Sequence, residues 1–95
     1  MRIGPYEIKP GVNLSGANLA RAYLSGINLS GAVLKETCLS EANLGSANLS
    51  QTDLTAAQFL DKANLTGTYL IGASFNQATT WPAGFTPPPE AIKVE

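Results

Sequence analysis

The feature that most constrains this 95-residue chain is a five-residue repeat that begins at Val12. A leucine or phenylalanine, called here the centre of each repeat, recurs at every fifth position. The centres are Leu14, Leu19, Leu24, Leu29, Leu34, Leu39, Leu44, Leu49, Leu54 and Phe59, followed after one extra residue by Leu65, Leu70 and Phe75. Repetition of this length predicts a solenoid, in which each repeat packs mainly against its neighbours.

A second periodic position lies two residues before each centre and holds alanine, threonine, valine or isoleucine. Its occupants are Val12, Ala17, Ala22, Ile27, Ala32, Thr37, Ala42, Ala47, Thr52, Ala57, Ala63, Thr68 and Ala73. A five-residue period matches neither the turn of an α-helix nor a heptad. In an extended strand, residues two apart face the same side. We therefore expect this residue and the centre to face inward, with the residue between them outward and a corner after each centre.

Repeats such as Ala17-Asn18-Leu19, Ala47-Asn48-Leu49 and Ala63-Asn64-Leu65 make residues 12–80 resemble the pentapeptide repeat family. The resemblance implies an all-β fold, a right-handed quadrilateral parallel β-helix with four repeats per coil and a little over three coils. The ending Thr80-Trp81-Pro82-Ala83-Gly84-Phe85 is similar to that of short cyanobacterial members, which suggests a cyanobacterial origin. The family shares no catalytic residues, so the resemblance implies none in this chain.

We expect one domain over residues 1–95, with an N-terminal cap at 1–11, the repeat β-helix at 12–79, and a C-terminal cap with a proline-rich tail at 80–95. Caps are expected because the ends of a solenoid expose an apolar layer and unpaired backbone. Trp81 and Phe85 are the predicted structural caps at the C-terminal end. The Trp81 ring should lie against Phe59 or Phe75.

Composition argues against several classes of function. One cysteine and no histidine exclude a disulfide framework and argue against a zinc site. A net charge of −1 argues against binding nucleic acid through charge. The apolar runs are too short to span a membrane, and the first residues lack the apolar core of a secretory signal. We therefore expect a cytoplasmic protein without cofactor, metal, nucleic-acid partner or membrane association.

Some polar residues have both a chemical and a structural interpretation. Arg21, Glu41 and Asp61 fall in one corner column, either as a recognition or acid–base group or, as we favour, as a surface ion ladder. Cys38 is interpreted as an incidental, partly exposed thiol. The extra residue before Leu65 is either a bulge beside a functional site or a neutral insertion. The outward asparagines should satisfy corner backbone groups instead of forming a binding array; they are Asn13, Asn18, Asn28, Asn43, Asn48 and Asn64.

Charge is distributed unevenly around the predicted coil. All charges within the repeats fall on two adjacent faces, and the two uncharged faces carry Tyr23, Tyr69 and Ile71 pointing outward. A charge-poor surface with large side chains resembles a protein interface, although chance placement of few charges is the alternative. The chain lacks histidine, a nucleophile–base pair and a phosphate-binding glycine loop, which argues against an enzyme.

We therefore predict a non-catalytic structural or protein–protein interaction module. Its partner would be an unknown protein or a weakly associating second copy. The alternative is a gyrase-binding DNA mimic. The resemblance implies this possibility because some family members have that activity. Short length and near-neutral charge disfavour that alternative.

Overall fold

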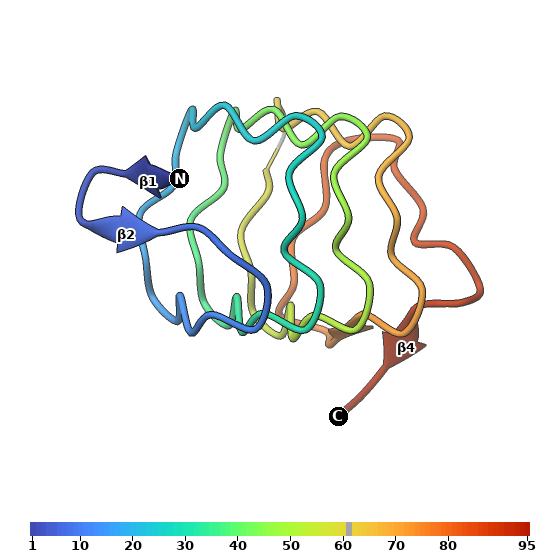
Figure 1. Ribbon diagram of the computed structural model, residues 1–95. Helices are drawn as coiled ribbons and strands as arrows, with labels where there is room; N and C mark the ends of the chain where they lie inside the picture. The colour runs from blue at the N-terminus through green and yellow to red at the C-terminus, as the bar shows by residue number, and fades with distance from the viewer. Residues whose placement is uncertain (61) are drawn as a thin grey trace.

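A computed structural model describes residues 1–60 and 62–95 as a coil of stacked repeats. The coils lie side by side along one axis, with the strands β1 and β2 at one end and β4 at the other (Figure 1). β1 (Arg2–Ile3) pairs antiparallel with β2 (Tyr6–Glu7), and β3 (Ser74–Phe75) pairs in parallel with β4 (Ile92–Lys93). The described part of the chain contains strands and no helix, as the sequence predicts.

Parallel pairing stacks the outward residues of the repeats into four columns, which form four sides of the coil. Side A carries Asn13, Val33, Asp53 and Ser74; side B carries Asn18, Cys38, Gln58 and Thr80; side C carries Tyr23, Asn43 and Asn64; side D carries Asn28, Asn48 and Tyr69. In the first coils the partners lie twenty residues apart, as in the pair Asn13 and Val33. This is the spacing that four repeats per coil require.

Extra residues lengthen this spacing at two places. The predicted insertion before Leu65 changes the spacing to 21 residues, so that Asn43 pairs with Asn64. A second lengthening, to 22 residues, joins Gln58 to Thr80. The five-residue period does not predict this second lengthening, because Trp81 follows Phe75 by six positions instead of five and so does not fall where the next centre is expected. Pairing therefore continues through Thr80.

The corners after the centres from Leu14 to Leu54, and after Leu65 and Leu70, are tight turns of one kind. In the first, the amide of Ala17 donates to the carbonyl of Leu14 over 3.0 Å, and Gly16 has a φ of 71°. A bond between residues three apart with positive φ at the third residue describes a type II turn. Residues other than glycine hold the same position with φ between 59° and 62° at Arg21, Glu36, Glu41, Ser46, Gln51 and Ala56. Only the surrounding structure can hold these residues in a left-handed conformation, which costs about 1–2 kcal/mol each.

In a repeat with a coil on each side, three backbone amides bond to the neighbouring coils. The outward residue donates to the preceding coil, as from Val33 to the carbonyl of Val12 at 2.8 Å. The centre and the left-handed residue donate to the following coil, as from Leu14 to Val33 at 2.7 Å and from Gly16 to Lys35 at 2.9 Å. The coils are therefore held together by continuous ladders, and no repeat is stable without a neighbour.

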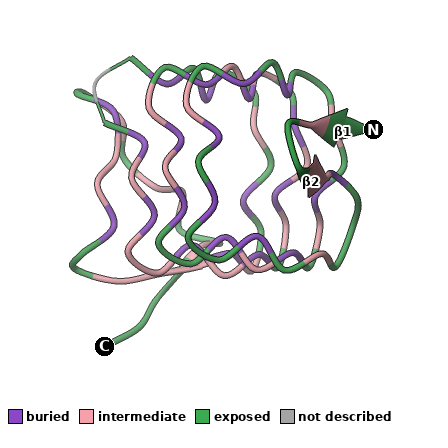
Figure 2. Ribbon diagram, turned by 90° about the vertical axis from the view of Figure 1, so that its left-hand side faces the viewer, coloured by how far each residue is buried: buried purple, intermediate pink, exposed green. Residues whose placement is uncertain are grey.

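The core is built from the centres and the small inward residues. Every centre from Leu14 to Leu54 is at most 3% exposed, and Phe59 is fully buried. Figure 2 shows buried stretches alternating with exposed ones along the coils. Inward threonines fit because their hydroxyls donate to carbonyls, as from Thr37 to Leu14 at 2.9 Å. No buried side-chain polar atom in the described residues lacks a hydrogen-bond partner.

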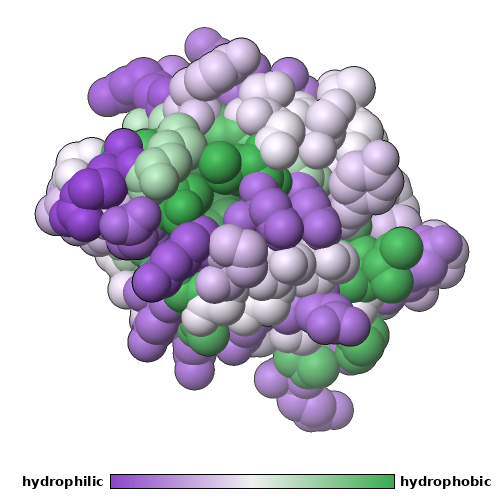
Figure 3. Space-filling view, in the orientation of Figure 1, coloured by the Kyte–Doolittle hydropathy of each residue, from purple (hydrophilic) through white to green (hydrophobic). Residues whose placement is uncertain are grey.

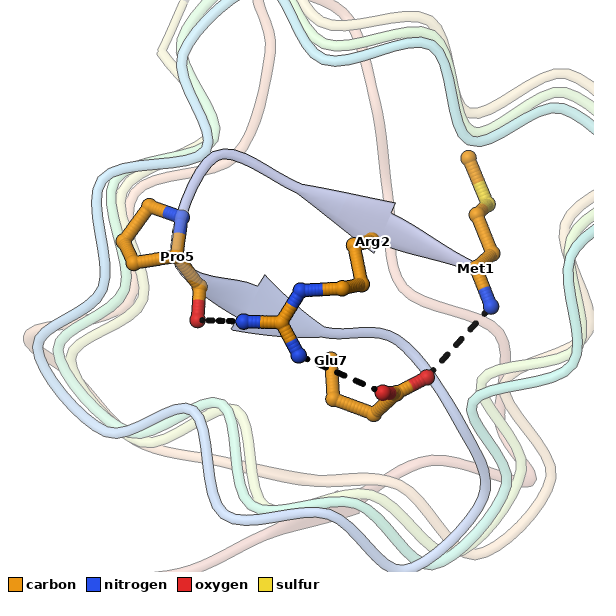
Figure 4. A network of polar contacts seen from close by, with 4 residues as sticks. All are labelled: Met1, Arg2, Pro5 and Glu7. Carbon is orange, nitrogen blue, oxygen red and sulfur yellow. Dashed lines mark hydrogen bonds and ion pairs between the residues drawn. The ribbon is translucent and has the colours of Figure 1, made fainter.

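The N-terminal end is covered by the β1–β2 hairpin. Ile8, directly after β2, is buried, and the Tyr6 hydroxyl accepts the amide of Asn18 over 3.3 Å. Figure 4 shows the polar contacts on the hairpin surface: Arg2 donates to the Pro5 carbonyl at 2.9 Å and to the Glu7 carboxylate at 3.4 Å. The Met1 ammonium also lies 3.4 Å from Glu7. Its hydrogen bond and charge are the main cause that lowers the pKa of Glu7.

At the C-terminal end, Trp81 lies against Phe59 and Phe75 of the last apolar layer. Its ring stacks on Phe59, with centroids 5.1 Å apart and an interplanar angle of 7°, and meets Phe75 edge-on at 5.5 Å. Phe85 covers Trp81 at 5.2 Å. The chain then returns to side A, where Ile92 of β4 pairs with Ser74. At this end, aromatic rings therefore pack in the middle and a returning strand pairs on side A.

Candidate interaction surface

The three predicted surface residues are all exposed, but they do not form one cluster. Tyr23 is 70% exposed in the first coil of side C, and Tyr69 is 59% exposed in the third coil of side D. Ile71, also 59% exposed, stands at the corner after side D. Two strand spacings, about 10 Å along the axis, separate Tyr23 from the other two residues. The structure therefore brings Tyr69 and Ile71 together and leaves Tyr23 on the adjoining side.

Two exposed apolar residues of the tail were missed from the sequence. Ile92 is 53% exposed and Val94 is 38% exposed. Just before these two residues, the tail is joined to the corner that contains Ile71: the amide of Gly72 donates to the carbonyl of Glu90 at 2.9 Å. The sequence offers one signal for this strand: the small residue Ala91 is followed by residues 92–95, in which apolar and charged side chains alternate. That stretch is too short to predict pairing. Figure 3 shows hydrophobic residues in separate groups between hydrophilic ones.

The outward asparagines are structural, as predicted. Asn48 accepts the amide of Ser50 on its Oδ1 at 3.0 Å, and the Ser50 hydroxyl donates to the same atom at 2.6 Å. The same bond, in which the amide two residues later donates to the asparagine Oδ1, recurs at Asn13, Asn18, Asn28, Asn43 and Asn64. This amide is the one in each repeat that the coil ladder leaves unpaired. The asparagine row is therefore occupied by its own backbone and offers little to a ligand.

The predicted ion ladder is not formed between its described members. Arg21 and Glu41 both occupy left-handed corner positions, and no ion pair joins them in the described residues. Exposed pairs gain too little to fix two long side chains, which explains the missing contact. Asp61, the third member of the column, lies outside the described residues. Cys38 is a half-buried free thiol on side B.

Two hollows lie at the C-terminal end. One groove of about 400 Å³ lies between residues 63–66 and residues 82–85. The other, of about 430 Å³, is lined by Phe75, Trp81, Pro87 and Lys93 among others. Within residues 1–60 and 62–95, no group of acidic or cysteine side chains could hold a metal ion. That same part contains no helix with the length and apolar character needed to cross a membrane.

Comparisons with known proteins bear on this geometry. The sequence profile of pentapeptide repeats matches eight copies within residues 13–51 and 60–79, more than half of the chain. Rfr23, a pentapeptide repeat protein of the cyanobacterium Cyanothece 51142, is 39% identical, with a TM-score of 0.50 over 78% of this chain and 46% of that one. Comparison with curated proteins gives no match.

Two further solved structures come from the cyanobacterium Nostoc PCC 7120. The pentapeptide repeat protein alr5209 is 37% identical over 80% of this chain and 66% of that one, with a TM-score of 0.46. HetL, a pentapeptide repeat protein involved in heterocyst differentiation regulation, is 32% identical over 70% and 35%, with a TM-score of 0.30. The chain thus spans from about one third to two thirds of the length of these relatives.

Proposed function

Since the chain belongs to the pentapeptide repeat family, we propose that it is a non-catalytic module that binds another protein through sides C and D. The observation that carries the proposal is the exposure of Tyr23, Tyr69 and Ile71 on sides that are otherwise small and polar. Tyrosine is enriched among the residues that dominate binding energy at protein interfaces. We further infer a right-handed quadrilateral β-helix of about three coils with closed ends as the scaffold.

The backbone supports these side chains in a fixed position. The amide of Tyr69 donates to Ala47 at 2.9 Å, and its carbonyl accepts from Leu49 at 2.8 Å. Both bonds join Tyr69 to the preceding coil, and a side chain carried on a backbone fixed in this way loses less conformational freedom when a partner binds. Tyr69 is therefore the expected anchor of the contact, with Ile71 beside it.

The size of the molecule limits what one side can do. The described chain measures 31 × 24 × 22 Å, so the projected area of any one side is below the roughly 800 Å² that each partner buries in a stable complex. A single-sided contact, including pairing with a second copy, should be weak. We therefore expect a tightly bound partner to cover both sides and to contact Tyr23 on side C as well as Tyr69 on side D.

The test compares Tyr69→Lys/Ile71→Lys with a matched control, Gln77→Lys/Ala78→Lys, which adds the same two charges at exposed positions. Both variants should melt like the native protein. Sedimentation across a concentration series measures self-association, and tagged protein in lysate of the source cell measures capture of a partner. We expect only the first variant to lose the interaction.

Three results would contradict the proposal. In one, both variants retain the interaction, so that sides C and D do not carry it. In another, both lose it equally, which indicates a general effect of added charge. In the last, the native protein inhibits DNA supercoiling by gyrase, which would support the DNA-mimic alternative in its place.

A further inference from the structure

The last repeat of side C has an uncovered backbone edge. One coil earlier, the amides of Leu44 and Ser46 each donate to this repeat over 2.8 Å. The equivalent amides of Leu65 and Gly67 have no acceptor within the described chain, and the carbonyl of Ala63 has no donor there. The three groups stand at the same repeat positions as the bonded amides of Leu44 and Ser46 and the bonded carbonyl of Ala42 one coil earlier. The edge is thus a template for one more parallel strand.

A groove runs along this edge. Its volume is about 400 Å³, with residues 63–66 on one wall and residues 82–85 on the other. The second wall is a turn in which the amide of Phe85 donates to the carbonyl of Pro82 at 3.0 Å and Gly84 has a φ of 80°. Because this turn stands beside the open edge, it keeps out the broad end of a second folded coil. A single extended chain can enter.

The protein itself shows that this end accepts an isolated strand. On side A, the amides of Ile92 and Val94 donate to the carbonyls of Ala73 and Phe75, both over 2.7 Å. β4 has no complete repeat before it, since described residues 82–89 make no backbone bond to the repeats of sides C and D, and pairing begins only at Glu90, whose carbonyl accepts from the Gly72 amide at 2.9 Å. Parallel addition of a short segment is therefore sufficient on side A.

We propose that the groove on side C binds an extended segment of another protein by parallel strand addition. The segment has a small residue, a polar residue and a leucine-like residue in that order, the pattern of the last two repeats on this side, Ala42-Asn43-Leu44 and Ala63-Asn64-Leu65. The amide of its polar residue donates to the Ala63 carbonyl. Its carbonyls, at the polar residue and two positions later, accept from Leu65 and Gly67. This site is separate from Tyr69 and Ile71 and does not depend on the proposed function.

The probe is a blocked peptide with the sequence of residues 62–68, KANLTGT, because this repeat already pairs in parallel with its equivalent on side C. Amide hydrogen exchange in the intact protein is the measurement. In the free protein, Leu65 and Gly67 should exchange fast, whereas Leu44 and Ser46 should be protected. At a peptide concentration about ten times the Kd, exchange at Leu65 and Gly67 should slow about tenfold, because only the free fraction exchanges.

Two controls separate strand addition from general stickiness. A peptide methylated on the backbone nitrogen of its asparagine lacks the donor for the Ala63 carbonyl. Its Kd should be more than about tenfold higher than that of the unmodified peptide, since the carbonyl is left unpaired. In the protein, Ala83→Trp fills the groove from an exposed position and should abolish protection. Ala78→Trp, equally exposed and outside the groove, should leave binding unchanged.

The proposal is overturned if Leu65 and Gly67 are as protected as Leu44 in the free protein, because the edge would then be covered. It is also overturned if the methylated peptide binds as well as the unmodified one, or if Ala83→Trp and Ala78→Trp behave alike. Protection that rises with protein concentration and without peptide would assign the edge to a second copy. Tyr69→Lys/Ile71→Lys should bind the peptide normally, so failure here and failure of the proposed function are distinguishable.

Discussion

Replacing Trp81 with alanine tests whether the aromatic rings close the C-terminal end of the coil. The ring stacks on the fully buried Phe59 at 5.1 Å and has further aromatic contacts at 5.2 and 5.5 Å. A buried aromatic-to-alanine change costs about 3–5 kcal/mol, and each aromatic pair contributes about 0.5–1.5 kcal/mol of its own. Since Trp81 is only half-buried, we expect a loss of about 2–4 kcal/mol.

That loss should be visible in a melting curve. For a domain of this size, 1 kcal/mol lowers the Tm by about 4–8 °C, so Trp81→Ala should melt at least about 8 °C below the native protein. Circular dichroism measures the coil as a whole. Trp81 is the only tryptophan, so its fluorescence in the native protein measures this end. If the end unfolds together with the coil, the two transitions of the native protein coincide.

Two substitutions act as controls for Trp81→Ala. Trp81→Phe keeps a stacked ring and should restore most of the loss. Tyr23→Ala removes an aromatic side chain that is 70% exposed and should change stability by less than about 0.5 kcal/mol. If Trp81→Ala and Tyr23→Ala melt within about 2 °C of each other, the rings do not close the coil and the reasoning is refuted.

Three smaller changes test the corner, the asparagine row and the hairpin. Gly26→Ala meets no atom within 4 Å but places a side chain at a φ of 70°, so it should cost about 1 kcal/mol in urea unfolding; an unchanged midpoint would contradict the strain argument. Asn48→Ala should speed amide exchange at Ser50 and cost about 1 kcal/mol, whereas equal exchange would remove the assigned bond. A lowered Glu7 pKa contributes stability that is fully present above the ordinary value of about 4.3 and is lost as the pH falls through the folded value, so Glu7→Gln should lower the Tm more at pH 7 than at pH 3. An equal effect at both pH values would exclude this linkage.

The fold was predictable because its signal is local and repeated. Leu29, Leu34 and Leu44 are fully buried as the five-residue period requires, and Asn48 bonds to its own corner. No similar signal exists for β4, a two-residue strand whose partner Ser74 lies 18 positions earlier. The open edge at Leu65 also follows from the path of residues 82–90, which no periodicity predicts.

The corner at Gly67 differs from the corners of the middle coil. In the middle coil, the left-handed positions Glu36, Glu41, Ser46 and Gln51 are not glycine, whereas glycine holds the equivalent position at Gly67. A middle corner is bonded on both sides: Ser46 donates to the coil after it, and the amide of Gly26 donates to Gly45 beside it. Two ladders together can hold a residue in a conformation that it would not adopt alone. The corner of Gly67 lacks this second ladder within the described chain, and glycine adopts its positive φ at little cost. Glycine at the edge therefore has two effects: it reduces strain, and it leaves the Gly67 amide without a side chain to shield it. In the strand-addition proposal, this Gly67 amide is one of the two donors that a further strand would accept from.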